Sequence, residues 1–381
     1  MPADAFGSLV SLPLASSHRG PLSLACTQCA QGQKMVLFVS GVCRFRCFYC
    51  PVGETRNQID VTYANERRVS CDADVLAEAH AIGAAGTGIT GGDPLGFTDR
   101  VEHYIRLLKS EFGPGHDIHL YTHEPNPEKL QKLIAAGLDE FRLHIPWYLW
   151  GPLRGEGQAY RRVLEDAAGW GVRRGVEIPV LPDHLPELRS LLRALDGIGL
   201  DFVNLNELEF SETNEQKLHA RGYVVDTRSG WGVRGSRAGA AALVRDLKLR
   251  TPVHFCSSRF KDGIQLRQRL LRRAARVAPA FAEHTGDGTV RLGIVEAPSR
   301  AALDRISREL ARRARLGPTD YRVDRVRRRV ELAPSRLRRV ARGLEAPAFV
   351  VEEYPTADAL EVEREPLNAA GIPAQARLGG T

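Results

Sequence analysis

The sequence predicts an α/β protein in which a full or partial (β/α) TIM-like barrel is followed by a small α+β ferredoxin-like C-terminal domain. Three observations lead to this prediction. Short apolar runs alternate with segments of helical periodicity, which is typical of βαβ units around a parallel sheet. Unusual polar and cysteine residues follow directly after these runs, and the carboxyl ends of barrel strands are where functional groups lie. After residue 278 the alternation changes to a shorter β-α-β-α-β order.

The alternating region contains seven predicted strands with helices between most of them. The strands are residues 35–39, 88–90, 118–121, 141–145, 175–180, 202–205 and 253–255. The helices are residues 73–84, 100–112, 127–136, 160–170, 185–195 and 238–249. A doubly wound open sheet remains an alternative at this point, because hydrophobic periodicity does not separate it from a barrel.

The C-terminal region carries its own set of predicted elements. The strands are residues 289–296, 321–332 and 348–353, and the helices are residues 299–315 and 335–343. This order in so short a span suits a ferredoxin-like sandwich. The expected organisation is an N-terminal extension with a Cys-x-x-Cys pair (1–33), the barrel (34–278), a basic α+β sandwich (286–366) and a loose tail (367–381).

Composition excludes several other classes of protein. Of 381 residues, 43% are hydrophobic and 26% are charged, which excludes a disordered chain, a collagen-like repeat and a small disulfide scaffold. The sequence contains no apolar run of about 18 residues, and its N-terminus lacks the basic-then-apolar order of a signal peptide. We therefore expect a soluble, cytoplasmic protein that does not enter a membrane.

Positive charge is concentrated in one part of the chain. The formal net charge is +7, yet residues 261–345 alone contain 22 basic and 10 acidic residues. A basic segment of this kind indicates an anionic partner, and RNA is the partner that we expect for the C-terminal region. The alternative is an ordinary solvated face, because surface helices need a polar side in any case.

Seven cysteines are present, and five of them fall between positions 26 and 50. An odd number of cysteines in a chain without an export signal favours metal or cluster ligation over disulfide bonds. Cys43, Cys47 and Cys50 form a Cys-x-x-x-Cys-x-x-Cys segment whose three thiolates can reach one centre. Three protein ligands leave one corner of an iron–sulfur cube open. A zinc knuckle or a tight cysteine-rich turn is the structural alternative.

The segment from Val42 to Pro51 resembles the signature loop of the radical S-adenosylmethionine (radical SAM) superfamily, and the resemblance extends over residues 34–260. It implies that Cys43, Cys47 and Cys50 hold a [4Fe–4S] cluster whose fourth iron binds the methionine moiety of S-adenosylmethionine (SAM). It also implies the reaction: an electron from the cluster cleaves SAM, and the resulting 5′-deoxyadenosyl radical abstracts hydrogen from a substrate. The reductant protein that would supply the electron is unknown.

Other positions match the superfamily pattern one by one. The resemblance places Tyr49 against the adenine of SAM. Gly91, Gly92 and Asp93 correspond to a Gly-Gly-Glu stretch whose backbone receives the ammonium group of SAM, with aspartate here replacing glutamate. Glu177 falls where the fifth strand of the superfamily flanks the adenine.

Polar residues also gather at the end of the predicted strand 202–205. Amide and carboxylate side chains in such a place need partners, because an unpaired buried polar group costs about 1–3 kcal/mol. We predict that Asn206 and Glu207 contact cofactor or substrate, with a salt bridge to a neighbouring arginine as the alternative. Further candidates for substrate contact near the predicted rim are His119, His123, Glu124 and His144.

The remaining cysteines predict an auxiliary site. Cys26 and Cys29 form a two-ligand clip that needs partners from elsewhere in the chain. We expect Cys26, Cys29 and Cys256 to hold a second iron–sulfur cluster or a zinc ion, with His254 or Cys71 as the fourth ligand. The alternative is that these are reduced cysteines in packing, or a redox pair.

Three segments also resemble a mostly archaeal branch of the superfamily that is distantly similar to pyruvate formate-lyase activating enzymes. They are residues 26–32, 204–209 and 256–262. Three functional hypotheses follow from the sequence. The first is a radical SAM enzyme that acts on RNA, most plausibly a transfer-RNA nucleoside. The second is a radical SAM activase or modifier of a protein or peptide, and the third is a non-enzymatic, metal-stapled RNA-binding protein.

Overall fold

The computed structural model describes residues 8–228 and 230–371. Its contacts divide the chain into two compact units, Met1–Leu266 and Arg267–Thr381. No helix in the described parts of the chain is long and apolar enough to cross a membrane.

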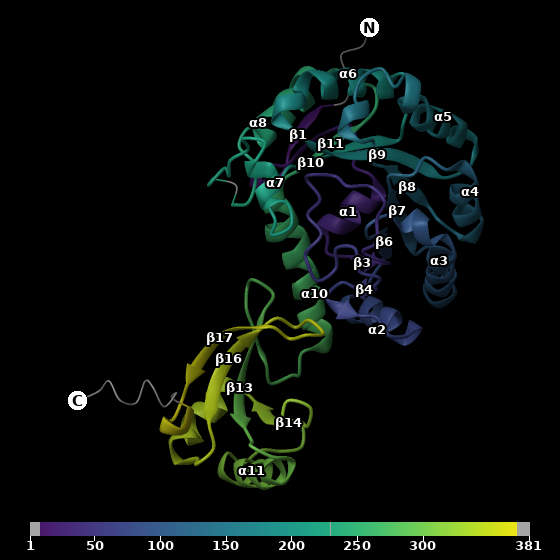
Figure 1. The fold of residues 1–381 in the computed structure, drawn as a ribbon. Coiled ribbons are helices and arrows are strands. Elements are labelled where there is room, and N and C mark those ends of the chain that lie inside the picture. Colours follow the sequence, from purple (N-terminus) through teal and green to yellow (C-terminus); the bar gives the residue numbers. More distant parts are fainter. Residues whose placement is uncertain (1–7, 229, 372–381) are drawn as a thin grey trace. The chain divides into compact units, whose positions relative to one another are not determined.

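One mixed sheet organises the first unit, in the strand order β1-β2-β11-β10-β9-β8-β7-β6-β3-β4-β5 (Figure 1). Its parallel strands are β3 (Lys34–Phe38), β6 (Gly86–Thr90), β7 (Asp117–Thr122), β8 (Glu140–Leu143), β9 (Arg173–Val180), β10 (Phe202–Glu207) and β11 (Val253–Cys256). These strands follow one another in sequence order without the reversal of a doubly wound sheet. The path ends at β1 and β5 within the described residues, so the sheet is a partial TIM-like barrel.

Each predicted strand of the barrel is present, and each predicted helix overlaps an observed one. The helices on the outer side of the curved sheet are α2 (Asp72–Ile82), α3 (Thr98–Phe112), α4 (Pro127–Ala136), α5 (Gln158–Asp166), α6 (Leu185–Asp196) and α8 (Ser236–Asp246). Their apolar sides join the strands in one core, to which Leu130, Leu191 and Leu243 contribute. Two shorter helices are α7 (Glu215–His219) and α9 (Ser258–Phe260).

Residues 9–30 are part of the barrel rather than a separate extension. A hairpin of β1 (Leu9–Ser11) and β2 (Ser17–Arg19) extends the sheet beside β11. At the other end, β4 (Tyr63–Ala64) and β5 (Arg67–Arg68) add to β3. These short strands escaped the sequence analysis because two or three residues are too few to show a period.

One helix lies inside the curve of the sheet. α1 (Leu24–Ala30) begins at Ser23, whose hydroxyl accepts a hydrogen bond from the Cys26 backbone, and packs against β3, β6 and β7 (Figure 1). Gly86 of β6 allows this approach, because a Cβ there would lie 2.8 Å from the Gln28 Oε1 atom. The helix therefore carries Cys26 and Cys29 into the interior of the barrel.

The second unit is an antiparallel sheet in the order β14-β15-β13-β16-β17, with β12 paired to β13. Its strands are β12 (Glu283–His284), β13 (Val290–Glu296), β14 (Tyr321–Asp324), β15 (Arg329–Leu332), β16 (Ala348–Glu353) and β17 (Glu361–Pro366). Its helices are α10 (Arg267–Val277), α11 (Arg300–Arg313) and α12 (Pro334–Val340). Leu303, Leu310 and Leu337 pack these last two helices on the sheet.

In this unit one local prediction was wrong and one strand was not predicted. The single strand expected over 321–332 is a hairpin, because the Asp324 carboxylate accepts hydrogen bonds from the backbones of Val326 and Arg327 and turns the chain. The sequence of this turn contains no glycine or proline that would have marked it. β17 was not expected, because its sequence Glu-Val-Glu-Arg-Glu-Pro is polar, as suits the edge of a sheet.

The boundaries also differ from those expected. α10 belongs to the second unit rather than to the barrel, because Gly288 packs on Leu270 and the Arg273 guanidinium donates to the Pro355 carbonyl. The tail expected from 367 is held at its start, where the Asn368 amide donates to three main-chain carbonyls of residues 341–346. Its remainder, 372–381, lies outside the described residues.

Much of the positive charge in the second unit is paired with carboxylates. Arg329 lies 2.8 Å from Glu353, and Arg338 lies 2.6 Å from Glu365. Further arginines with acidic partners are Arg267, Arg291, Arg313, Arg322, Arg325, Arg327, Arg336 and Arg364. This pairing reduces the net positive field that a nucleic acid would meet.

Candidate functional site

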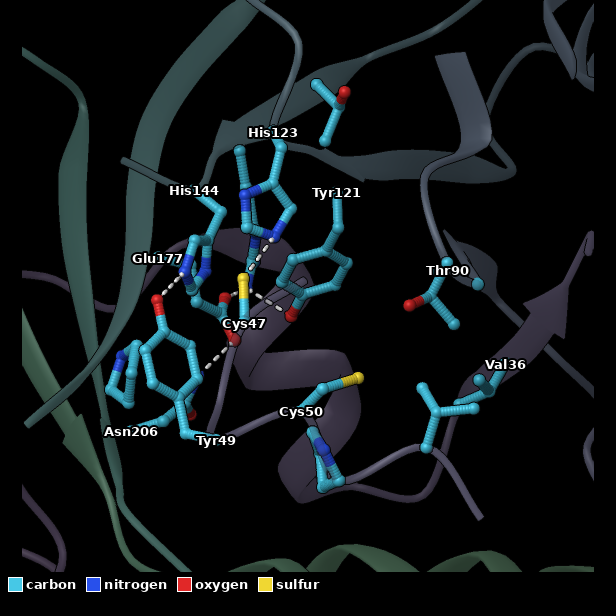
Figure 2. Close-up of a pocket in the computed structure, with 18 of the residues that line it drawn as sticks. Val36, Cys47, Tyr49, Cys50, Thr90, Tyr121, His123, His144, Glu177 and Asn206 are labelled. Carbon is cyan, nitrogen blue, oxygen red and sulfur yellow. Dashed lines mark hydrogen bonds and ion pairs between the residues drawn. The ribbon is translucent and has the colours of Figure 1, made fainter. Parts of the chain in front are cut away.

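A cavity of about 940 Å³ lies within the first unit and contains nearly all of the candidate site residues (Figure 2). Its lining includes Cys26, Cys29, Cys43, Cys47, Tyr49, Cys50, Gly91, Gly92, Glu177, Asn206, Glu207 and Cys256. Three predicted residues are not part of the lining: Asp93, Cys71 and Glu124, which pairs with Lys129 at 3.0 Å. The structure therefore brings together residues that lie more than 200 positions apart.

The three-cysteine segment forms a loop after β3, and its own contacts shape it. Gly41 exchanges backbone hydrogen bonds with Gln58 and Ile59, which brings the two ends of the loop together. The Gln58 side chain accepts from the Cys43 amide at 3.3 Å and donates to the Cys43 carbonyl at 2.9 Å. All three thiols are partly exposed and face the cavity, as ligands of one cluster must.

Aromatic side chains anchor the loop in the barrel. Phe48 packs edge-on against Tyr49 and Trp147, and it stacks on Tyr223 with ring centroids 6.2 Å apart. The buried Tyr49 hydroxyl lies 2.8 Å from the Nε2 atom of His144, as Figure 2 shows. Tyr49 is thus directed across the site by a partner from the end of β8.

The Gly-Gly-Asp segment after β6 packs closely against the cysteine loop. The Gly92 amide donates to the Ser40 carbonyl at 2.7 Å. The backbone of Gly91 has a φ of +150°, a value that residues other than glycine rarely adopt. Asp93 accepts from the Leu95 amide at 3.2 Å and from the Thr122 hydroxyl at 2.6 Å. Burial raises the pKa of Asp93 despite these bonds. Aspartate at this position therefore braces the turn, while the glycine backbone faces the cavity.

We expect Gly92→Ala to disrupt the cysteine loop. A Cβ at this position would lie 2.4 Å from the Val42 carbonyl oxygen and 2.8 Å from the Cys43 Cβ, so the loop must move. We predict a loss of more than about tenfold in affinity for SAM, measured by equilibrium dialysis with the reconstituted protein, since misplacement of about 1 Å costs up to 10²-fold in rate. Gly96→Ala is the matched control, because nothing lies within 4 Å of its added Cβ. Equal affinities in the two variants would contradict this role of Gly92.

Glu177 and Asn206 lie in the interior of the barrel and contact each other. The Asn206 amide donates to Glu177 at 2.7 Å, and the Arg142 guanidinium donates to the other carboxylate oxygen at 2.6 Å. The side chain of Glu207 contacts the start of α9 instead of Glu177. One of its carboxylate oxygens accepts hydrogen bonds from the Ser258 amide at 3.0 Å and from the Ser258 hydroxyl at 3.1 Å. Its second oxygen is buried and has no hydrogen-bond partner within the described residues.

Arg142 is the functional-site residue that the sequence analysis missed. Its guanidinium is buried and also contacts Glu140 at 2.6 Å, the Tyr121 hydroxyl at 3.1 Å and the Cys26 thiol at 3.6 Å. Its signal in the sequence is a charge between Phe141 and Leu143, inside a strand with apolar neighbours. An arginine in such a strand needs carboxylate partners on the adjacent strands.

Two histidines approach the middle cysteine of the loop. The Cys47 sulfur lies 3.7 Å from the Nε2 atom of His123, and the donor atoms of Cys47, His123 and His144 all lie within 4.8 Å of one another. Burial lowers the pKa of His123 to about 2 and that of His144 to about 4, so both rings are neutral. Burial raises the pKa of the Cys47 thiol to about 12, so a bound metal must displace its proton.

The partial barrel and the three-cysteine loop after its first parallel strand define a class of iron–sulfur enzymes that cleave SAM. Residues 37–146 match the radical SAM superfamily, and residues 288–367 match a domain of unknown function (DUF8061). A protein of Methanocaldococcus jannaschii, which carries the provisional name of a glycyl-radical enzyme activating enzyme, is 35% identical over 362 residues. The match covers 90% of this chain and 92% of the relative. The chain belongs to the radical SAM superfamily, in the same family as this archaeal protein.

Two solved structures resemble the chain only distantly. SuiB of Streptococcus suis bound to SAM is 9% identical with a TM-score of 0.37, and the match covers 67% of this chain and 52% of that chain. A variant of spore photoproduct lyase is 15% identical with a TM-score of 0.39, and the match covers 64% of this chain and 83% of that chain. With TM-scores below 0.5, neither structure gives information about the site of this chain.

Membership in the superfamily confirms an enzyme that uses a [4Fe–4S] cluster and SAM. The site fits both groups, because three partly exposed thiols of one loop face a cavity with room for a further ligand. The membership also excludes the non-enzymatic hypothesis.

Proposed function

We propose that the substrate of this radical SAM enzyme is a protein or peptide and that the enzyme acts as an activase or modifier of it. The observation that carries the proposal is the 35% identity over 90% of the chain to a protein named as an activating enzyme. The cavity of about 940 Å³ lies near the upper end of the roughly 300–1,000 Å³ range of small-molecule sites. It would accommodate SAM together with an extended segment of polypeptide.

The proposed roles of the residues follow from their positions. Cys43, Cys47 and Cys50 would hold the cluster, which when bound supplies the electron that cleaves SAM to methionine and a 5′-deoxyadenosyl radical. The backbone of Gly91 and Gly92 would receive the ammonium group of SAM. Tyr49 would pack on its adenine.

Further residues would complete the SAM site from inside the barrel. Glu177 and Asn206 would bind polar groups of SAM or substrate, because their side chains already form one hydrogen-bonded pair at the cavity wall. Glu207 would contribute through its unpaired carboxylate oxygen, while its other oxygen holds the start of α9.

We also propose that the second unit is a ferredoxin-like domain. The order β13-α11-β14-β15-α12-β16 and the arrangement of strands β14-β15-β13-β16 support this assignment. β17 would then be an addition at one edge of the sheet. The pairing of the second unit's arginines with carboxylates favours a polypeptide over RNA as the partner. The name of the archaeal relative, an activating enzyme, favours the same choice.

The experiment that tests the proposal measures 5′-deoxyadenosine formation by the anaerobic, reduced enzyme with SAM. A desalted extract of the source organism is added after treatment with protease, with ribonuclease, or with neither. We expect the extract to stimulate formation, protease to abolish the stimulation and ribonuclease to leave it intact. Stimulation that ribonuclease abolishes and protease spares would overturn the proposal and restore RNA as the substrate.

A further inference from the structure

A second set of sulfur and nitrogen donors lines the same cavity as the radical SAM loop. Cys26 and Cys29 lie three residues apart on α1 and so share one side of that helix. Cys256 ends β11, and His254 stands two residues earlier on the same face of the strand. All four line the cavity, whereas Cys71 is exposed at the start of α2 beside Asp74.

Two of the three sulfur atoms of this set, those of Cys26 and Cys256, already accept hydrogen bonds from polar donors. The Arg142 guanidinium donates to the Cys26 sulfur at 3.6 Å, and the Gln265 amide donates to the Cys256 sulfur at 3.4 Å. Lys261 lies close enough to Cys256 to influence its ionisation. Donors and positive charges in these positions stabilise thiolate ligands and tune the metal that they hold.

His254 provides an independent indication of a ligand. Its side chain is 5% exposed, and within the described residues neither ring nitrogen has a hydrogen-bond partner. An imidazole buried in this way costs about 1–3 kcal/mol when its polar atoms stay unpaired. Coordination of a metal through one ring nitrogen would remove much of this cost.

The spacing of the donors favours a cluster over a single ion. A zinc ion about 2.0–2.3 Å from each ligand would hold the donor atoms within about 3–4 Å of one another. In the described parts of the chain, only Cys47, His123 and His144 form a group of three or more His, Cys, Asp or Glu donors within 4.8 Å. Cys26, Cys29, Cys256 and His254 are therefore spaced more widely. The sulfur atoms of Cys43, Cys47 and Cys50, the proposed ligands of the radical SAM cluster, also do not form such a compact group.

We propose that Cys26, Cys29, Cys256 and His254 ligate a second iron–sulfur cluster, which shares the barrel cavity with the radical SAM cluster. The three cysteines and the histidine come from two elements that face the same space. The test of this site measures metal binding, so its outcome is independent of whether the substrate is the polypeptide proposed above. Radical generation at the first loop does not require it.

The decisive protein is the full chain with Cys43→Ala, Cys47→Ala and Cys50→Ala together. After anaerobic reconstitution with iron and sulfide, we expect about four irons and four sulfides per chain, and about twice that number for the unaltered chain. The spectrum of the triple variant should not change when SAM is added. A folded triple variant without iron, or one that holds zinc and no sulfide, would overturn the proposal.

Variants of the second set complete the test in the same triple background. Adding Cys26→Ala with Cys29→Ala, or Cys256→Ser alone, should lower iron to background, while Cys71→Ala should leave it unchanged. Circular dichroism checks that each protein is folded, and the two independent variants guard against the misfolding of one. His254→Ala should remove the histidine nitrogen coupling from the pulsed EPR spectrum of the reduced cluster. Retention of that coupling would exclude His254 as the ligand.

Discussion

Replacing Cys43, Cys47 or Cys50 by alanine is expected to abolish the formation of 5′-deoxyadenosine from SAM. Each of these thiols is one of the three protein ligands that we propose for the cluster, and the loop offers no fourth cysteine as a substitute. Removing even a partner of a metal ligand costs 10–100-fold in metal affinity or activity, so we expect a loss of more than about 100-fold. The measurement is chromatographic quantification of 5′-deoxyadenosine with the anaerobic enzyme and dithionite.

Cys71→Ala is the matched control for this loss. Cys71 is exposed, lies outside the cavity and contacts Asp74 at the start of its own helix, so its removal should leave the rate unchanged. Cys26→Ala should also retain reductive cleavage of SAM, because the second site does not hold the radical SAM cluster. Full activity in any one of the three loop variants would refute the assignment of that cysteine as a ligand.

Arg142→Met is expected to destabilise the first unit by about 3–5 kcal/mol, the usual cost of removing one partner of a buried ion pair. The guanidinium lies 2.6 Å from both Glu140 and Glu177, and all three side chains are buried. Methionine fills a similar volume but removes the cationic partner of Glu177 and leaves Glu140 with Arg173 at 3.2 Å. The measurement is the free energy of unfolding in urea, followed by far-UV circular dichroism.

The matched control is an exposed arginine that also forms a short ion pair. Arg161→Met removes a contact of 2.8 Å to Glu165 on the surface of α5, where such pairs contribute about 0.3–0.5 kcal/mol. A cost for Arg142→Met as small as that for Arg161→Met would show that the buried network does not stabilise the barrel.

The cost of Arg142→Met should depend on pH with a definite sign. Burial by itself would raise the pKa of Glu177, but Arg142 and Asn206 together hold this pKa below its ordinary value of 4.5. In the unaltered protein this contribution to stability is therefore present above about pH 4.5 and is lost only as the pH falls below it. Without Arg142 burial dominates and the pKa rises, so Glu177 can take up a proton in the folded state. The difference in stability between the two proteins should shrink from pH 8 to pH 5, and a constant difference would contradict this account.

The barrel could be predicted from the sequence because its signals are local and repeated. Each parallel strand is an apolar run, and each outer helix carries one apolar side, so the alternation is visible without knowledge of distant contacts. The radical SAM loop was visible for the same reason, since Cys43, Cys47 and Cys50 are close neighbours in the chain. Radical SAM membership confirms that expectation.

The position of α1, the hairpin at 321–332 and the partners of Arg142 could not be predicted from neighbouring residues in the sequence. α1 has only seven residues, and nothing in its sequence indicates that it lies inside the sheet rather than outside. The hairpin at 321–332 turns on one aspartate side chain, among valines that continue the strand pattern on both sides. Arg142 shows its partners only when β8 is aligned beside β9, which places Glu177 within reach of its guanidinium.

The sequence by itself determined the kind of chemistry, because three thiols within eight residues can meet at one centre whatever the rest of the chain does. Only the tertiary structure decided which other residues line the same cavity as these thiols. Cys26, His254 and Cys256 do so because α1 lies inside the sheet and β11 completes its parallel strands. This arrangement depends on the packing and register of distant segments, which backbone hydrogen bonds and side-chain burial establish only when the barrel forms.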